Sequence, residues 1–192
     1  MENVGLITYT ERYIFLSTPT PSDLTDLAEV VFHEIAHMWF GNLVTMRWWD
    51  DLWLNESFAT YAAALCLTEG SEHTTAWQEF NVQLKRWSLV EDDSPTTHPI
   101  AGTVADTDQT FLNFDGITYG KGGAVLKQLG ARLGRAGFSA GLRLHFQRHA
   151  FGNATLAEFL ASLEEGSGVS LADWSAEWLR TSGPNRLGAE IT

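Results

Sequence analysis

Residues 33–37 read HEIAH, and Glu56 follows after eighteen more residues. Histidines four positions apart on a helix project from the same face, so the rings of His33 and His37 can reach one metal ion. Two imidazoles and one carboxylate leave the fourth tetrahedral position open for water, which is typical of a catalytic zinc site. The pattern therefore predicts one Zn²⁺ ion bound by His33, His37 and Glu56.

Glu34 directly follows the first histidine, where it would lie beside the metal-bound water without binding the metal. Zinc lowers the pKa of its water to about 7, and a neighbouring carboxylate can take the proton while the water attacks a carbonyl carbon. We therefore predict Glu34 to be the general base of a hydrolase. The alternative is an ordinary amphipathic helix whose histidines form only hydrogen bonds, but the downstream Glu56 favours the metal site.

Two predicted helices carry these residues. The first covers residues 26–40, with an Asp-x-x-Glu start that resembles a capping box, and it stops at Gly41. The second begins after Asp50 or Asp51, either of which could be its N-cap, and ends at Gly70, which places Glu56 in its second turn. The link between the helices must reverse the chain so that Glu56 faces the histidines.

The remaining sequence predicts a mainly helical scaffold with a small β component. Strand character is limited to the start, from Val4 to Leu16. An irregular loop is expected over residues 91–117, where Asp, Ser, Pro, Thr and Gly dominate. Further helices are expected at residues 73–90, 118–133, 138–150, 156–165 and 170–179. The predicted fold class is therefore mainly α, formally α+β, with about seven helices and an N-terminal β remnant.

The other histidines have no comparable pattern. His145 and His149 are again four positions apart on a predicted helix, but no acidic residue follows them as Glu56 follows the first pair. Neighbouring leucines and phenylalanines indicate that this second pair packs in the core rather than binds a metal. His98 is interpreted as a structural loop residue, because nothing in its spacing connects it to the metal site.

Charge and composition exclude some classes of partner. The net charge of −12 would repel nucleic-acid phosphates and attract cationic peptide N-termini. No apolar stretch of the sequence is long enough to span a membrane. The single cysteine, Cys66, cannot form an intrachain disulfide and is compatible with a reducing compartment. We expect a cytoplasmic protein that binds neither nucleic acid nor membrane.

Four segments carry a more specific pattern than the ligands alone. They are MENVGLITY at 1–9, HEIAHMWFGNLVT at 33–45, WWDDLWLNESFA at 48–59 and FDGITYGKG at 114–122. Together they closely resemble the zinc aminopeptidases of the aminopeptidase N family, a group of gluzincins. A metzincin would instead carry Gly and His where this chain has Phe40 and Leu43. The resemblance extends over nearly the whole chain and implies a thermolysin-like catalytic domain.

The resemblance implies roles for two further residues. Glu2 would bind the free α-ammonium of a peptide substrate, which makes the enzyme an exopeptidase. Tyr119 would donate its hydroxyl to the oxyanion that develops on the attacked carbonyl. The alternatives are a solvated glutamate at position 2 and a tyrosine buried at the start of a helix.

The resemblance also implies that residues 1–192 form one catalytic domain that is truncated at its N-terminal strands. The β domain that precedes it in the family and the C-terminal helical domain that follows are absent from this sequence. A first strand without sheet neighbours would expose an edge, so self-association through that edge is expected. The amine of Met1 would lie one residue from Glu2 and could occupy the site of a substrate N-terminus.

Competing functions belong to different classes. The leading prediction is a zinc aminopeptidase core that acts on peptides with a free N-terminus, with Glu34 as base and Tyr119 on the oxyanion. The alternatives are a zinc-binding fragment without turnover and a relative of leukotriene epoxide hydrolase, which uses the same zinc ligands. A thermolysin-like endopeptidase is disfavoured, since it would have no use for Glu2.

Overall fold

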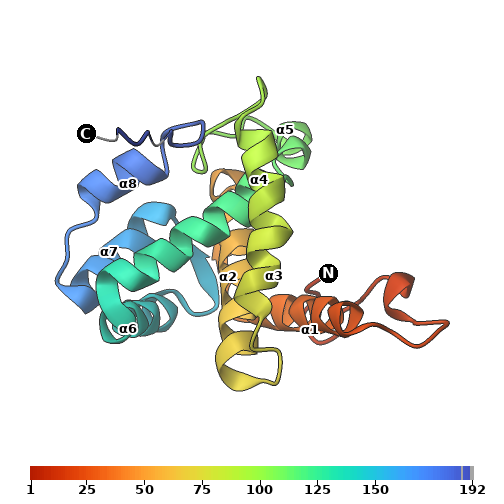
Figure 1. Cartoon of the computed structure of the whole chain (residues 1–192). Coiled ribbons are helices and arrows are strands. Elements are labelled where there is room, and N and C mark those ends of the chain that lie inside the picture. Colours follow the sequence, from red (N-terminus) through yellow and green to blue (C-terminus); the bar gives the residue numbers. More distant parts are fainter. Residues whose placement is uncertain (187, 191–192) are drawn as a thin grey trace.

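The computed structural model describes residues 1–186 and 188–190, and these residues are mainly helical (Figure 1). The α-helices are α1 (Pro21–Ala36), α2 (Leu52–Gly70), α3 (Ala76–Val82), α4 (Leu84–Asp92), α5 (Thr107–Leu112), α6 (Gly122–His149), α7 (Leu156–Ser167) and α8 (Ala172–Trp178). A short π-helix, Ile117–Lys121, precedes α6. Two 3₁₀-helices, Glu11–Tyr13 and Trp49–Asp51, and two short strands, β1 (Val44–Met46) and β2 (Gly152–Ala154), complete the described elements. The prediction of a mainly α chain with a small β component is confirmed.

Helix α1 begins earlier than predicted. Thr20 is its N-cap, and the Thr20 hydroxyl accepts a hydrogen bond from the Asp23 amide while the Asp23 carboxylate accepts one from the Thr20 amide. This capping box, together with Pro21 at the first helical position, starts the helix there instead of near Asp26. The helix ends at Ala36, before the predicted end, because the following residues turn into β1.

Helix α2 forms the centre of the molecule, with α1 on one side and the α6–α8 helices on the other (Figure 1). It spans the predicted residues and is buried on nearly all faces, as Leu54, Ala59 and Leu67 illustrate. Leu126 and Leu129 of α6 and Phe159 and Leu163 of α7 belong to the same fully buried core. Such burial on both sides holds α2 rigidly, and with it any side chain that α2 presents to α1.

The predicted N-terminal strand does not form. Residues Val4 to Leu16 contain no β-strand, and Met1 and Thr8 instead exchange backbone hydrogen bonds within a turn. The β component lies elsewhere, where β1 pairs in parallel with β2 and Val44 is in register with Gly152. Strand propensity alone was insufficient, because a strand needs a neighbour to satisfy its backbone groups. The strand edge on which the prediction of self-association rested is therefore missing.

Three further boundaries differ from the predictions. The helix expected at 73–90 is interrupted at Gln83, which separates α3 from α4. The helices expected at 118–133 and 138–150 are both present as two segments of α6, separated by a kink at Gly134 where φ is 68° and ψ is 158°, but the second segment begins directly after Gly134 and not at Phe138. Helix α5 interrupts the loop expected over residues 91–117.

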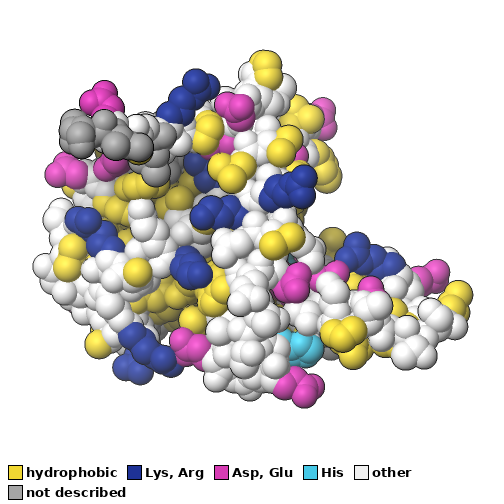
Figure 2. Space-filling model, in the orientation of Figure 1, with side chains coloured by type: hydrophobic (Ala, Val, Ile, Leu, Met, Phe, Trp, Pro, Cys, Tyr) yellow, Lys and Arg dark blue, Asp and Glu magenta, His cyan; other side chains and the backbone are white. Residues whose placement is uncertain are grey.

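The surface has two features that the ribbon alone does not convey. The arm formed by α1 and the residues before it stands out from the body of the molecule (Figure 2). Hydrophobic side chains gather in the hollow between the α3–α4 column and the α6–α8 helices, where Leu89, Val125 and Trp178 line a cavity of about 450 Å³. Within the described ranges, no helix combines the length and apolar character needed to cross a membrane.

Candidate active site

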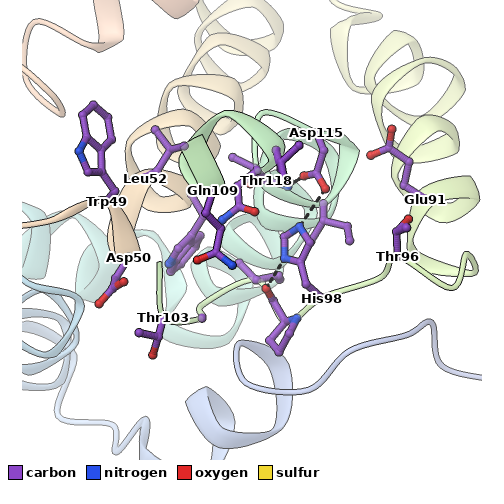
Figure 3. A pocket seen from close by; sticks show the side chains of 17 residues that line it. Trp49, Asp50, Leu52, Glu91, Thr96, His98, Thr103, Gln109, Asp115 and Thr118 are labelled. Carbon is purple, nitrogen blue, oxygen red and sulfur yellow. Dashed lines mark hydrogen bonds and ion pairs between the residues drawn. The ribbon is translucent and has the colours of Figure 1, made fainter. Parts of the chain in front are cut away.

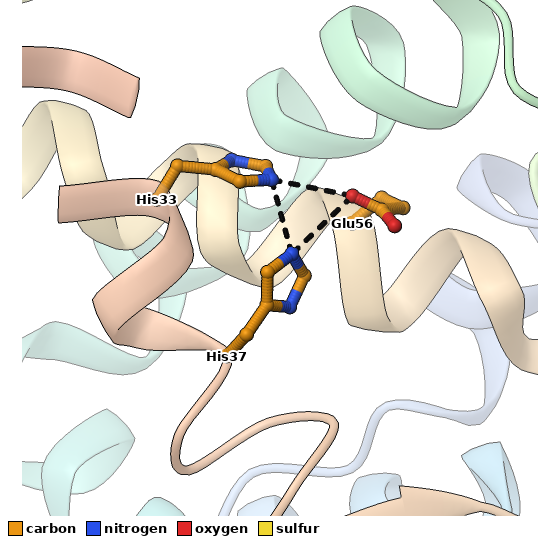
Figure 4. Close-up of side chains that lie close together, drawn as sticks. All are labelled: His33, His37 and Glu56. Atoms are coloured by element: carbon orange, nitrogen blue, oxygen red, sulfur yellow. Dashed lines mark hydrogen bonds and ion pairs between the residues drawn. The ribbon is translucent and has the colours of Figure 1, made fainter. Parts of the chain in front are cut away.

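The three predicted metal ligands converge where the end of α1 meets the start of α2 (Figure 4). The Nε2 atoms of His33 and His37 are 3.1 Å apart. The Oε2 atom of Glu56 lies 3.2 Å from Nε2 of His33 and 3.5 Å from Nε2 of His37. The chain reversal between the two helices thus brings all three donor atoms to one point.

This triangle fits a zinc ion. Donor atoms about 2.0–2.1 Å from a tetrahedral zinc are separated from one another by roughly 3.3–3.4 Å. The three observed separations, 3.1, 3.2 and 3.5 Å, bracket that value. The cluster also has suitable donor atoms, because two imidazole nitrogens and a carboxylate oxygen face one another and can bind a divalent cation. A fourth coordination position would remain for water.

The outer nitrogens of both histidines have partners that orient the rings. Nδ1 of His37 lies 3.1 Å from the carbonyl oxygen of Phe40 and 3.1 Å from Oδ1 of Asn55. Because both are acceptors, Nδ1 carries the proton and Nε2 is left with the lone pair that a metal needs. Nδ1 of His33 lies 3.4 Å from the hydroxyl of Thr60. The metal-facing nitrogen of His37 is thus set by residues that do not touch the metal.

Gly41 allows the close approach that places Asn55 against His37. Its φ is 127°, and a Cβ at this position would lie 2.6 Å from Oδ1 of Asn55. A side chain here would therefore collide with the atom that accepts the proton of His37, and it would also be strained by the positive φ. The glycine that ends the predicted first helix thus has a second role in shaping the site.

The charges of the cluster support each other. Burial by itself would raise the pKa of Glu56, but hydrogen bonds from His33 and His37 outweigh burial and lower the pKa to about 2. Burial would likewise lower the pKa of His37, but the adjacent Glu56 carboxylate outweighs it and raises the pKa. Glu56 is therefore ionised at neutral pH, as a metal ligand must be.

Tyr119 enters the site from the π-helix that precedes α6. Its ring lies between two others, with ring centroids 6.1 Å from His33 and 6.3 Å from Trp87. Burial, followed by the negative charge of Glu56, raises the pKa of its phenol above the ordinary value. The hydroxyl therefore keeps its proton across the physiological pH range and can act as a hydrogen-bond donor.

Glu2 and Glu34 lie on the open side of the metal cluster. A carboxylate oxygen from each and a ring nitrogen of His37 lie within 4.8 Å of one another. The side-chain amide of Asn42 donates to the carbonyl oxygen of Glu2 at 2.7 Å and holds this segment against the site. The Met1 amine forms an ion pair with the carboxylate of Glu34, at 2.9 Å. The amine was expected to lie near Glu2, and it also contacts the residue predicted to be the general base.

All six residues predicted from the sequence line one cavity of about 440 Å³. They are Glu2, His33, Glu34, His37, Glu56 and Tyr119. The same cavity is lined by Asn55, Trp49 and Phe114, which sequence reasoning did not select. A histidine that binds a metal through one ring nitrogen usually has a hydrogen-bond acceptor on the other nitrogen. This rule predicts that a residue such as Asn55 exists, but it does not identify which residue it is.

Comparison with known proteins agrees with this geometry. The family model of the peptidase family M1 domain matches residues 1–178. The chain belongs to peptidase family M1.

Curated relatives of this M1 chain are aminopeptidases by name. It is 50% identical to aminopeptidase N of Streptomyces lividans, over 100% of this chain and 22% of that protein. It is 39% identical to human glutamyl aminopeptidase, over 95% of this chain and 19% of that protein. It is 38% identical to probable aminopeptidase 2 of Sulfurisphaera tokodaii, over 95% of this chain and 24% of that protein. The chain thus spans about a fifth to a quarter of the length of these relatives.

Two other histidines of the M1 chain lie outside this cavity. His145 is 1% exposed and packs between the rings of Phe40 and Phe159, in agreement with the predicted packing role. His98 lies in the loop after α4, as expected, but Nε2 of its ring is 2.8 Å from Oδ2 of Asp115. No spacing or motif in the sequence predicts this ion pair.

Proposed function

We propose that this chain is the catalytic core of a zinc aminopeptidase that hydrolyses the N-terminal peptide bond of peptides. The observation that carries the proposal is the triangle of His33, His37 and Glu56, whose edges of 3.1–3.5 Å suit tetrahedral zinc. Membership of peptidase family M1 supports a peptidase role for it. The names of the relatives support removal of N-terminal residues rather than internal cleavage.

In the proposed mechanism, a bound zinc ion would supply an acidified water and polarise the scissile carbonyl. Glu34 takes the proton from that water as the water attacks, and later delivers it to the leaving amine. Tyr119 donates its hydroxyl to the developing oxyanion, a contribution that is typically worth about 10²–10³ in kcat. The raised pKa of Tyr119 keeps that proton in place.

Glu2 gives the proposed enzyme its preference for a free N-terminus. Its carboxylate lies next to Glu34 and His37 on the open side of the cluster, where the ammonium of a bound peptide would be held one residue from the scissile bond. A blocked N-terminus presents no charge to Glu2 and fills the space that the ammonium needs. Longer-range attraction from the net charge of −12 would raise the local concentration of cationic N-termini.

The test compares an aminoacyl anilide with its N-acetylated form, together with elemental analysis of the protein. We expect zinc at one ion per chain, hydrolysis of the free substrate only, and a loss of about 10²–10⁴ in kcat for Glu34→Gln with zinc retained. Glu72→Gln, at an exposed position, is the matched control and should leave the rate unchanged. Hydrolysis of the acetylated substrate would contradict the proposal.

Two other outcomes of this test correspond to the alternative functions. Stoichiometric zinc without turnover of any anilide would identify a metal-binding domain that is inactive by itself. Epoxide hydrolysis without anilide hydrolysis would identify an epoxide hydrolase that uses the same ligands. Cobalt or manganese in place of zinc would leave the ligand set intact but change the identity of the metal.

A further inference from the structure

We propose that His98 is a positioning residue for Tyr119 and that it acts through Asp115. The proposal rests on the proposed function, in which the Tyr119 hydroxyl stabilises the oxyanion. His98 does not line the zinc-site cavity but an adjoining cavity of about 710 Å³, together with Asp115 and Thr118 (Figure 3), and Trp49 and Leu52 line both cavities. Because the zinc-site cavity is not lined by His98, the role proposed for it is exerted through its neighbours and not by contact with a substrate at the metal.

Both nitrogens of the His98 ring face acceptors. Nε2 lies 2.8 Å from Oδ2 of Asp115, and Nδ1 lies 2.7 Å from the carbonyl oxygen of Pro99. A carbonyl oxygen and a carboxylate oxygen only accept, so each ring nitrogen must donate, and the ring is the doubly protonated imidazolium. The contact with Asp115 is therefore a charge-assisted hydrogen bond, which is stronger than one between neutral groups.

Asp115 passes this constraint to the π-helix that carries Tyr119. Its Oδ1 atom accepts a hydrogen bond from the amide of Thr118 at 2.9 Å, and its carbonyl oxygen accepts one from the amide of Tyr119 at 3.1 Å. One carboxylate oxygen thus holds His98 and the other holds the residue next to Tyr119. Rotation of this carboxylate would loosen the backbone from which the catalytic hydroxyl projects.

The rest of the π-helix is held from two other directions. Ser57 of α2 donates to the carbonyl oxygen of Thr118 at 2.6 Å. Gly120 packs directly on the backbone of Leu84 in α4, where a Cβ would collide with the Leu84 carbonyl oxygen. These contacts keep the segment in place as a whole, and the Glu91 carboxylate accepts a hydrogen bond from the amide of Gly116 just before it. His98 instead supports Asp115, the side chain that binds the amide of Thr118 in the first turn. We therefore expect its loss to misplace Tyr119 without unfolding the domain.

Two conservative substitutions separate the Asp115 contact from the loop contact. The Nε2 amide of glutamine can replace Nε2 of the ring, so His98→Gln keeps a donor for Asp115. The Nδ2 amide of asparagine can replace only Nδ1, so His98→Asn keeps a donor for Pro99 and loses Asp115. If His98 only stabilises the loop, the asparagine variant should resemble the wild type more closely. If His98 positions Tyr119 through Asp115, the glutamine variant should resemble the wild type more closely.

The first measurement is a double-mutant cycle on kcat with zinc-loaded protein. We expect His98→Asn to lower kcat by about tenfold with KM and zinc content unchanged, because a small misplacement of a transition-state donor acts on kcat. In a Tyr119→Phe background the same substitution should change kcat by less than about twofold, since there is no hydroxyl left to misplace. Equal losses in both backgrounds would overturn the proposal.

The second measurement does not depend on zinc or turnover. The chain has four tyrosines, so ¹³C labelling of the rings gives few signals, and Tyr119→Phe assigns the one of interest. We expect His98→Asn to shift or broaden the Tyr119 signal alone and His98→Gln to restore it. An unmoved Tyr119 signal overturns the positioning role even if the protein is an active aminopeptidase. A moved signal in a protein without zinc or turnover would support the positioning contact and contradict only the proposed function.

Discussion

Two pairs of histidines in this chain have the same spacing and opposite surroundings. His33 and His37 lie 4.7 Å apart between ring centroids, and His145 and His149 lie 5.0 Å apart. The first pair faces the carboxylate of Glu56, whereas His145 faces aromatic rings. Spacing on a helix therefore aligns two rings, but the element packed against that helix decides whether the rings form a candidate metal site or part of a core.

The electrostatics of the two pairs differ accordingly. Glu56 raises the pKa of His37 despite its burial. Burial, followed by the charge of His149, lowers the pKa of His145 to about 4, and both nitrogens of its ring lack a hydrogen-bond partner. A buried polar group without a partner costs about 1–3 kcal/mol, so His145 is tolerated in the core as a neutral ring.

The largest expected effect breaks the first pair. His37→Ala should abolish zinc binding and lower any peptidase activity by roughly a thousandfold or more, because the metal contributes several kcal/mol to the transition state. His149→Ala, the matched substitution in the second pair, should leave zinc content and activity unchanged. Elemental analysis and anilide hydrolysis check both. Zinc retained in the His37 variant would show that the ligand set is wrong.

The second prediction concerns the dependence of stability on pH. The pKa of His145 is about 4 in the folded chain, below its ordinary value of 6.5. Between pH 6.5 and pH 4, His145 is therefore protonated in the unfolded chain but neutral in the folded chain. Stability should therefore fall as pH drops from about 6.5 to about 4, by on the order of 3 kcal/mol from this residue. Urea unfolding at several pH values should show a smaller decline for His145→Leu.

His37 should have the opposite sign in metal-free protein. Its raised pKa means that the stability it contributes is fully present below pH 6.5 and is lost as pH rises through the raised value. The same urea series on metal-free His37→Gln would lack that loss. If the His37 and His145 variants changed the pH profile in the same direction, the electrostatic contrast between the pairs would be wrong.

The third prediction concerns the residue that orients His37. Asn55→Ala should weaken zinc binding by about 10–100-fold, because a partner on the outer nitrogen fixes the ring and its tautomer. Asn81→Ala, at an exposed position of α3, is the control for loss of an asparagine. Competition with a chromophoric chelator gives the affinity. Equal affinities for both variants would mean that the carbonyl of Phe40 suffices to orient the ring.

The smallest effect concerns the second pair. The charge of His149 contributes to the lowered pKa of His145, after burial. His149→Gln should therefore raise the pKa of His145 slightly without bringing it to the ordinary value. An NMR titration of the His145 ring measures this directly. A return to the ordinary value would show that His149, and not the apolar core, sets the behaviour of His145.

The local chemistry of the site was predictable because it follows from helical spacing and donor type. His33, His37 and Glu56 were selected on these grounds, and the end of α2 at Gly70 followed from its glycine. The β component was misplaced, because strand propensity at Val4 to Leu16 does not reveal whether a neighbouring strand is available.

The sequence by itself determined which residues are the candidate metal donors, the mainly helical fold and the order of the segments that line the site. Only the tertiary structure decided which ring nitrogen of His37 faces His33 and Glu56, that His98 pairs with Asp115, and that His145 is enclosed by aromatic rings. The physical reason is the distance along the chain over which each property is determined. Spacing along a helix is a local property, whereas the partner of a side chain depends on how separate elements pack, and that is decided by the whole buried core.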